Sequence, residues 1–222
     1  MFNTKFRYTD RASKGRYVWE KYQPVLAASG NVLDVGADKG ALGPFLPKSV
    51  KYLTIGYGEH IAVRHNLENI PWPFADASFD VVLCLDVLEH LENIHAAFDE
   101  CCRMAAKYVI ISLPNPYADF MRFLYNGKYM GRPKDMKFYG LTPEPEGDRH
   151  RWFFSPTDAR KFIDFRCVAN GFFIIQHDSE TQENIGGGGV KHPLQIFFRK
   201  DLPVQDFETG TLWWILQREK TI

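Results

Sequence analysis

A glycine-containing turn follows a short apolar segment near the start of the chain. Residues 31–35 read NVLDV, and the turn after them extends from Gly36 to Gly40. Glycines let a backbone approach a ligand closely, and the start of a helix supplies oriented amide groups. The pattern therefore predicts a ligand-binding loop between a strand and a helix. A nicotinamide-binding fingerprint has three glycines here, and Gly36 supplies only one, because Asp38 and Ala41 occupy the other two positions.

Three further side chains have the chemistry of a binding or catalytic site. Asp86 directly follows the apolar segment 79–85, at a strand end where open α/β sheets bind ligands, so cofactor contact is favoured over a solvated loop carboxylate. His90 is either a base or a helix-capping residue, and the structural role is favoured. His150 lies in the sequence DRHRWFF, and a histidine with its ordinary pKa can take a proton from a hydroxyl near neutral pH. His150 and His90 are therefore the candidate catalytic residues.

The cysteines show no metal-ligand spacing. They are Cys84, Cys101, Cys102 and Cys167. Three of them lie in apolar segments, where a free thiol behaves as a small hydrophobic group. We expect reduced thiols in the core, which favours a cytoplasmic protein, and the sequence predicts no metal site.

Short apolar segments alternate with amphipathic segments along most of the chain. The expected strands are 31–35, 51–55, 79–85, 108–113, 172–176 and 211–217. The expected helices are 13–29, 41–46, 94–105, 116–125 and 156–169. Asn93 is expected to cap the third of these helices. The alternation predicts an α/β fold with a parallel sheet and right-handed crossovers.

The clearest helix signal begins at Ser155. This residue can cap the helix, with Pro156 in the first position and Asp158 three residues beyond the cap. The side chains expected to face the core are Ala159, Phe162, Ile163 and Ala169.

The segment 116–154 is expected to form a lid over the acceptor. After its first helix it shows no clear period, and long irregular connections in compact domains are usually functional or disordered. Its basic residues include Arg122, Lys128, Arg132, Lys134 and Lys137. A solvated basic loop fits this composition, and so does a site that holds an anionic or sugar-like acceptor through arginine and aromatic side chains.

Composition predicts one folded domain over residues 1–222, with an N-terminal helix region in residues 1–30. Hydrophobic residues make up 45% and charged residues 24%, and 27 Lys and Arg balance 27 Asp and Glu. Such a chain has no overall field that would attract nucleic acid or an acidic membrane. No apolar run approaches the length of about 18 residues needed to cross a membrane. We expect no nucleic-acid partner, no membrane insertion and a cytoplasmic location, and the oligomeric state is left open.

Several motifs resemble those of the class I S-adenosylmethionine-dependent methyltransferases, in particular the type 11 group. The family's first motif is acidic-x-Gly-x-Gly-x-Gly, and Asp34, Gly36 and Gly40 match it, with an aspartate at the middle glycine. Residues 73–82 read PFADASFDVV and residues 86–91 read DVLEHL, both similar to family segments and at the family's spacing. The resemblance implies a Rossmann-like, doubly wound, mostly parallel seven-stranded sheet with an antiparallel last strand. It also implies a lid inserted after the fifth strand and S-adenosylmethionine as the cofactor.

The same resemblance implies a set of cofactor-binding residues. They are Asp34, Gly36, Ala37, Gly40, Gly58, Glu59, Asn66, Leu67 and Asp86. The acidic residue that takes the ribose hydroxyls in the family corresponds to Gly58, so Glu59 is expected to do this from one residue later. Asn66 stands where the family has an aspartate near the adenine amino group, and its side-chain oxygen can still accept that hydrogen bond. Few residues separate these positions, so the intervening helix is expected to be nearly absent.

The expected function is methyl transfer from S-adenosylmethionine to an oxygen, or with less support a nitrogen, of a small or glycan-linked acceptor. Two alternatives are a non-catalytic cofactor-binding protein on the same fold and a nicotinamide-dependent oxidoreductase. If Gly36 lies against the cofactor, Gly36→Val should abolish cofactor binding and leave the fold largely intact, as calorimetry would show.

Overall fold

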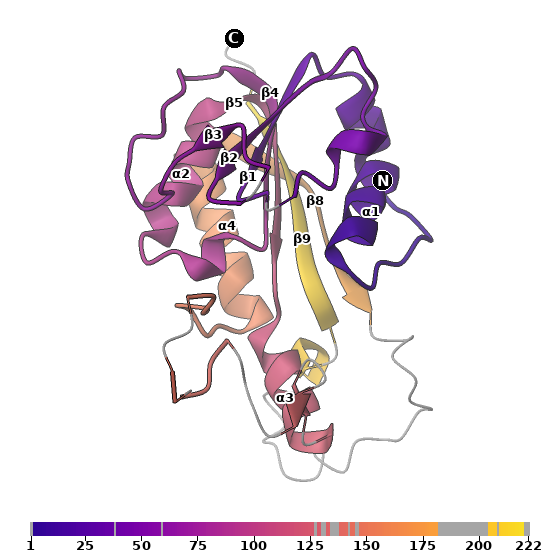
Figure 1. The fold of residues 1–222 in the computed structure, drawn as a ribbon, viewed down its shortest axis with the longest axis vertical. Coiled ribbons are helices and arrows are strands. Elements are labelled where there is room, and N and C mark those ends of the chain that lie inside the picture. Colours follow the sequence, from indigo (N-terminus) through magenta and orange to yellow (C-terminus); the bar gives the residue numbers. More distant parts are fainter. Residues whose placement is uncertain are drawn as a thin grey trace.

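A seven-stranded sheet in the order β3-β2-β1-β4-β5-β9-β8 forms the centre of the molecule (Figure 1). The computed structural model describes residues 2–37, 39–58, 60–126, 128–129, 132–133, 138–141, 143–144, 147–181, 204–207 and 209–219. The strands are β1 Asn31–Val35, β2 Lys51–Gly56, β3 Val63–Arg64, β4 Phe79–Leu85, β5 Ala105–Leu113, β8 Phe172–Thr181 and β9 Thr209–Arg218. Strands β1 to β5 are parallel, whereas β9 is antiparallel to both β5 and β8. The expected doubly wound, mostly parallel α/β sheet with an antiparallel last strand is confirmed.

Helices cover both faces of this sheet (Figure 1). They are α1 Arg11–Ala27, α2 Ile94–Met104, α3 Pro116–Asn126 and α4 Pro156–Ala169, with short 3-10 helices at Gly43–Phe45, Leu88–His90 and Val204–Phe207. Successive side chains of a strand point to opposite faces, so alternate residues of β4 join different cores. Val81 and Leu83 pack in the core on the α1 side, while Val82 and Cys84 pack in the core beneath α2 and α4.

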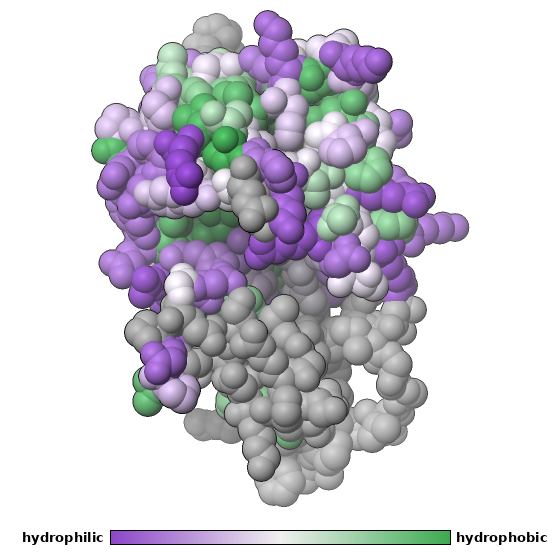
Figure 2. Space-filling model, in the orientation of Figure 1, coloured by the Kyte–Doolittle hydropathy of each residue, from purple (hydrophilic) through white to green (hydrophobic). Residues whose placement is uncertain are grey.

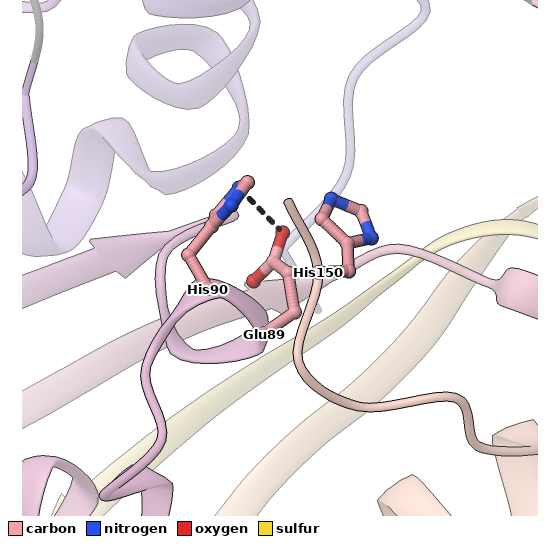
Figure 3. A group of neighbouring side chains, drawn as sticks. All are labelled: Glu89, His90 and His150. Atoms are coloured by element: carbon pink, nitrogen blue, oxygen red, sulfur yellow. Dashed lines mark ion pairs between the residues drawn. The ribbon is translucent and has the colours of Figure 1, made fainter. Parts of the chain in front are cut away.

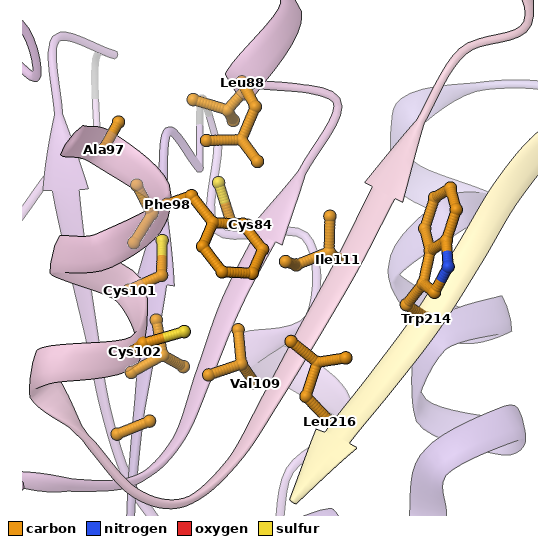
Figure 4. Close-up of a cluster of buried hydrophobic side chains, with 14 of the residues drawn as sticks. Cys84, Leu88, Ala97, Phe98, Cys101, Cys102, Val109, Ile111, Trp214 and Leu216 are labelled. Atoms are coloured by element: carbon orange, nitrogen blue, oxygen red, sulfur yellow. The ribbon is translucent and has the colours of Figure 1, made fainter. Parts of the chain in front are cut away.

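The larger apolar core lies between the sheet and helices α2 and α4. Figure 4 shows Phe98 and Cys101 of α2 beside Cys84 of β4 and Ile111 of β5. Because the central strands are covered on both faces, their sequences are continuous apolar runs rather than alternating ones. All four cysteines are buried and free, as the sequence predicts.

Most strands have bounds close to those predicted from the apolar pattern. The helix predicted after the glycine turn does not form. The expected strands 31–35 and 79–85 have the same bounds as β1 and β4. The helix expected over residues 41–46 is wrong, because only the three-residue 3-10 helix Gly43–Phe45 forms there. Prolines within and directly after this segment have no amide hydrogen with which to extend a helix. The sequence pattern also misses β3, whose two residues are too few to show a period.

Helix α4 begins with the expected capping box. The hydroxyl of Ser155 accepts a hydrogen bond from the Asp158 amide at 3.0 Å, and the Asp158 carboxylate accepts one from the Ser155 amide at 3.2 Å. The inward position expected for Ala169 is wrong, because this residue is exposed and Cys167 is buried. With 3.6 residues per turn, the stripe through Ala159 and Ile163 continues to position 167.

Helix α2 begins without the expected side-chain cap. Asn93 stands at the cap position but makes no side-chain hydrogen bond there. The carboxylate of Glu68 accepts hydrogen bonds from the amides of Glu92 at 2.7 Å and Asn93 at 3.1 Å. A carboxylate is favoured at a helix N-terminus because the helix dipole is positive there. The loop after β3 is thereby attached to α2.

The segment between β5 and α4 begins where β5 ends. It contains α3 and a small antiparallel hairpin, β6 Lys128–Tyr129 with β7 Arg132–Pro133. Helix α3 lies beyond the end of β5 (Figure 1). The expected insertion after the fifth strand is therefore present.

Hydrophobic side chains form a group near the top of the face shown in Figure 2, with hydrophilic ones around it. None of the helices in the described ranges is both long and apolar enough to cross a membrane.

Candidate active site

The candidate site lies where the strand order reverses between β1 and β4. From β1 the chain continues to its neighbour β2, whereas β4 pairs with β1 on one side and β5 on the other. The segments after β1 and β4 therefore face each other at the carboxyl edge of the sheet, where open α/β sheets bind ligands. This edge carries Gly36 and Asp86, as the sequence predicts.

Asp34 lies near the end of β1 and is only 7% exposed. The hydroxyl of Tyr52 in β2 donates a hydrogen bond to its carboxylate. Burial raises the pKa of Asp34 to about 6, against the opposing effects of the Tyr52 hydroxyl and the Lys14 ammonium. The carboxyl group is thus poised to change its charge just below neutral pH.

The glycine turn is shaped by the strands on either side of it. The amide of Gly36 donates a hydrogen bond to the Ile55 carbonyl at 2.8 Å, and Gly36 has a positive φ of 69°. A β-carbon at Gly36 would lie 2.4 Å from a methyl group of Val87, which is itself buried. The expectation that Gly36→Val leaves the fold intact is therefore wrong, because the new side chain has no space and the backbone angle disfavours it.

The remainder of the turn differs from the expected helix start. Gly40 has a positive φ of 59°, and a β-carbon there would lie 3.6 Å from the Tyr52 ring. Ala37 is half-buried. Asp38, at the position of the missing middle glycine, lies outside the described residues. No α-helix starts after Gly40 in the described residues, and the first element there is the 3-10 helix Gly43–Phe45.

The expected ribose and adenine residues lie after β2. Gly58 is half-buried in a bend, and Glu59 lies outside the described residues. The side-chain oxygen of Asn66 accepts a hydrogen bond from the Glu68 amide at 3.0 Å, which shapes its own turn. Leu67 is buried in the larger core. The described residues between β2 and β3 form no helix, so the expected loss of that helix is confirmed.

Asp86 is held by two groups that the sequence analysis misses. The Ser112 hydroxyl of β5 donates a hydrogen bond to it at 2.5 Å, and the ammonium of Lys14 in α1 forms an ion pair with its other oxygen. Burial acts to raise the pKa of Asp86, but the Lys14 ammonium and the Ser112 hydroxyl outweigh it and hold this pKa below its usual range. The carboxylate is therefore ionised, and 40% of its side chain remains exposed.

A weak signal for Lys14 and Ser112 is present in the sequence. Lys14 is four residues before the inward-facing Val18, so it is a charged residue on the apolar stripe of α1. Ser112 is the one polar residue near the end of the apolar strand β5. Each is a polar group in an apolar pattern, and such groups are usually paired.

The rings of His150 and His90 lie edge-on against each other, and Figure 3 shows both of them beside Glu89. Their ring centroids are 4.6 Å apart at an interplanar angle of 86°, and the His150 ring also stacks on Phe138 at 4.2 Å. The amide of Arg151 donates a hydrogen bond to the Glu89 carbonyl at 2.7 Å. The end of the insertion is thereby attached to the segment that follows β4, with His150 at this junction.

His90 has a defined protonation pattern. Its Nδ1 lies 3.1 Å from the carbonyl oxygen of Arg149, which can only accept, so Nδ1 carries the proton. Burial lowers the pKa of His90 and outweighs the opposing effect of the Asp148 carboxylate. The ring is therefore neutral near pH 7, with the lone pair on Nε2.

Glu89 lies between the two histidines and was not selected from the sequence. Its side chain is 1% exposed, and neither carboxylate oxygen has a hydrogen-bond partner among the residues that the structure describes. Burial, with a further effect of Asp86, raises the pKa of Glu89 well above its usual range. The nearby His90 Nε2 is 3.9 Å from one carboxylate oxygen.

Comparisons with known proteins agree with this fold. Residues 44–111 match the family model of a methyltransferase domain, whereas no curated protein matches the chain significantly. A SAM dependent methyltransferase from Archaeoglobus fulgidus has a TM-score of 0.60 at 15% identity, with 96% of each chain covered. An S-adenosylmethionine dependent methyltransferase from Mesorhizobium loti has a TM-score of 0.51 at 12% identity, covering 88% of this chain and 93% of that one. The [4+2]-cyclase SpnF has a TM-score of 0.56 at 12% identity, covering 99% and 87%.

Residues 44–111 match a methyltransferase domain, and the fold is the Rossmann-like α/β fold found in S-adenosylmethionine-dependent methyltransferases. The solved structures are too distant in sequence to show more than the fold, and one of them is a cyclase. The activity is supported by the family match over residues 44–111. The individual contacts expected from the cofactor-binding residues, and the catalytic roles of His150 and His90, remain predictions.

The raised pKa of Asp34 predicts a pH-dependent stability. A carboxyl group that holds its proton more tightly in the folded chain contributes less stability as the pH rises from about 4 through about 6. Between pH 5 and pH 7, the wild-type chain should lose about 1 kcal/mol more unfolding free energy than Asp34→Asn, whose amide oxygen can still accept from Tyr52. Urea unfolding of both chains at the two pH values measures this, and parallel pH profiles would contradict it.

Proposed function

We propose that the chain methylates a hydroxyl oxygen of a small or glycan-linked acceptor. One observation carries this proposal: the His150 ring lies edge-on against the ring of His90, with 4.6 Å between their centroids. His90 belongs to the 3-10 helix Leu88–His90, which follows β4. Ligands of open α/β sheets bind at this strand edge. An imidazole at that position is suited to take the proton that a hydroxyl loses when it is methylated.

The reaction needs alignment and one proton acceptor. The new bond joins the acceptor oxygen to the methyl carbon, and the bond broken joins that carbon to sulfur, which keeps the electron pair. The hydroxyl proton passes to His150, with His90 as the second candidate. Because the methyl group arrives already activated, the side chains at this edge have to hold the acceptor in line and accept the proton.

Contacts around the two histidines support their use as bases. The lone pair of His90 is on Nε2, on the side of Glu89. The His150 ring is fixed by Phe138, which stacks on it, and by Tyr139, whose hydroxyl lies 2.7 Å from Nδ1. Contacts on the ring face and at one nitrogen fix the orientation of the His150 ring. A base needs a fixed orientation because it has to lie in line with the hydroxyl that it deprotonates.

The described part of the insertion favours a hydroxylated, sugar-like acceptor over an anion. Arg149 donates to the carbonyl of Gly140 at 2.5 Å, and Arg151 lies 3.6 Å from Glu92, so both guanidinium groups already have acceptors. In contrast, Trp152 and Phe153 keep 37% and 53% of their surface exposed. Exposed aromatic rings offer apolar faces on which a sugar ring can pack.

Calorimetry on the full chain tests the cofactor side of the proposal. S-adenosylmethionine and S-adenosylhomocysteine should each bind once per chain, and NAD should not bind, because the glycine turn lacks two of the three dinucleotide-binding glycines. Preferential NAD binding would contradict methyl transfer and favour a nicotinamide-dependent oxidoreductase.

The proton acceptor is tested by His150→Ala. Loss of the base should lower kcat by about 100-fold or more with hydroxyl acceptors and leave the affinity for S-adenosylmethionine unchanged. If His150 only orients the insertion, the loss should appear mainly as a raised KM for the acceptor. Turnover and cofactor affinity are measured on the same preparation.

A matched control is His95→Phe. His95 is exposed on α2, and its ring meets Trp152 and Phe162 edge-on, contacts that phenylalanine can keep. This variant removes an imidazole outside the site and should retain wild-type turnover. Equal turnover in His150→Ala and His95→Phe would exclude His150 as the base.

A further inference from the structure

Glu89, His90 and His150 place three metal-ligating atoms together at the carboxyl edge of the sheet. One ligand atom from each lies within 4.8 Å of the other two. An ion at the centre of three donors with that separation would lie about 2.8 Å from each, so each donor has to approach by less than about 1 Å to reach usual bond lengths of about 2.0–2.2 Å.

The buried carboxylate of Glu89 is the second observation that points to a ligand. It is 1% exposed and has no hydrogen-bond partner among the described residues. Buried carboxylates are normally paired with a cation or several donors, because an isolated one loses its hydration without replacement. Figure 3 shows this carboxylate beside the rings of His90 and His150. A cation at that point would pair the buried group.

In both histidines Nδ1 is already engaged, and His90 has the outer contacts that are typical of a metal ligand. Histidines that bind a metal commonly donate the other ring N–H to a carbonyl or carboxylate, which fixes the ring and its tautomer. Nδ1 of His90 lies 3.1 Å from the Arg149 carbonyl and 3.4 Å from an Asp148 carboxylate oxygen. Nδ1 of His150 lies 2.7 Å from the Tyr139 hydroxyl. In both rings Nε2 is then the nitrogen that would bind the ion.

We propose that Glu89, His90 and His150 bind one divalent transition-metal ion at the edge of the cofactor site. Two imidazoles and one carboxylate form a mixed nitrogen and oxygen set, which suits Mn²⁺, Fe²⁺, Co²⁺ or Zn²⁺ better than the all-oxygen preference of Mg²⁺ or Ca²⁺. The ion is not predicted by the sequence analysis, because the ligands lie in two segments that meet only in the fold.

The position of this site suggests what the ion does, and this part rests on the proposed function. Three protein ligands leave coordination positions for an acceptor hydroxyl, and a bound divalent ion makes such a hydroxyl easier to deprotonate. The ion would also hold that oxygen at the carboxyl edge that carries Asp86, where ligands of open α/β sheets bind. As metal ligands, His150 and His90 would orient the acceptor rather than take its proton, and the proton would pass to water.

Binding of Co²⁺ by the untagged full chain, without cofactor or acceptor, tests the site directly. After treatment with a chelator and dialysis, Co²⁺ should bind once per chain, develop visible absorption bands of a nitrogen- and oxygen-ligated ion, and raise the melting temperature. Glu89→Gln and His150→Ala should each weaken Co²⁺ binding by at least about 100-fold. His95→Phe should bind as the wild type does.

Two results would overturn the proposal. One is a wild-type chain that binds no Co²⁺ in saturable fashion, and the other is equal Co²⁺ binding by wild type, Glu89→Gln and His150→Ala. Circular dichroism and calorimetry with S-adenosylmethionine check that each variant is folded. If Glu89→Gln does not fold, His150→Ala alone tests the metal site. If the chain binds Co²⁺ but not S-adenosylmethionine, the metal site stands and the proposed function is contradicted. If it binds S-adenosylmethionine but not Co²⁺, the metal site is contradicted and the proposed function stands.

Discussion

The reversal of strand order between β1 and β4 is the constraint on which the site depends. It leaves the segments after these strands facing each other at the carboxyl edge. They approach so closely that Gly36 contacts the Val87 side chain without space for a β-carbon. The same junction receives Lys14 from α1 and the end of the insertion through the bond from Arg151 to Glu89. Elements from distant parts of the chain therefore meet at the edge where the chain leaves β1 toward β2 and leaves β4 toward β5.

Three carboxyl groups lie at this edge, and their surroundings shift their pKa values in different ways. Asp86 has a cation and a hydroxyl and stays ionised. Among the described residues Asp34 has the Tyr52 hydroxyl as its hydrogen-bond partner, and burial brings its pKa to about 6. Glu89 has no hydrogen bond from any described residue, and burial raises its pKa well above the usual range. The local supply of positive charge, rather than depth alone, decides which group carries a negative charge in a low-dielectric site.

The sequence predicts those features that depend on neighbours in the chain. The apolar runs of β1 and β4 and the capping box at Ser155 are local patterns, and all three are found as expected. Pairing between distant segments is different: Lys14 and Asp86 meet through the fold, and nothing in either segment specifies the other. Glu89 could be recognised as unusual only once its burial was known. The motif resemblance pointed to the carboxyl edge of the sheet, and the structure added the charged and polar partners of the carboxyl groups there.

The position of β9 has a consequence for how the chain is made. This strand lies between β5 and β8, and Tyr108 pairs with Gln217, about a hundred residues later in the sequence. While the chain is being synthesised, β5 leaves the ribosome long before its second neighbour exists. Its apolar edge is then open to pairing with other chains, which is a common route to aggregation. The yield of folded protein in a cell should therefore depend on how quickly residues 209–218 emerge and insert, more than on the stability of the finished sheet.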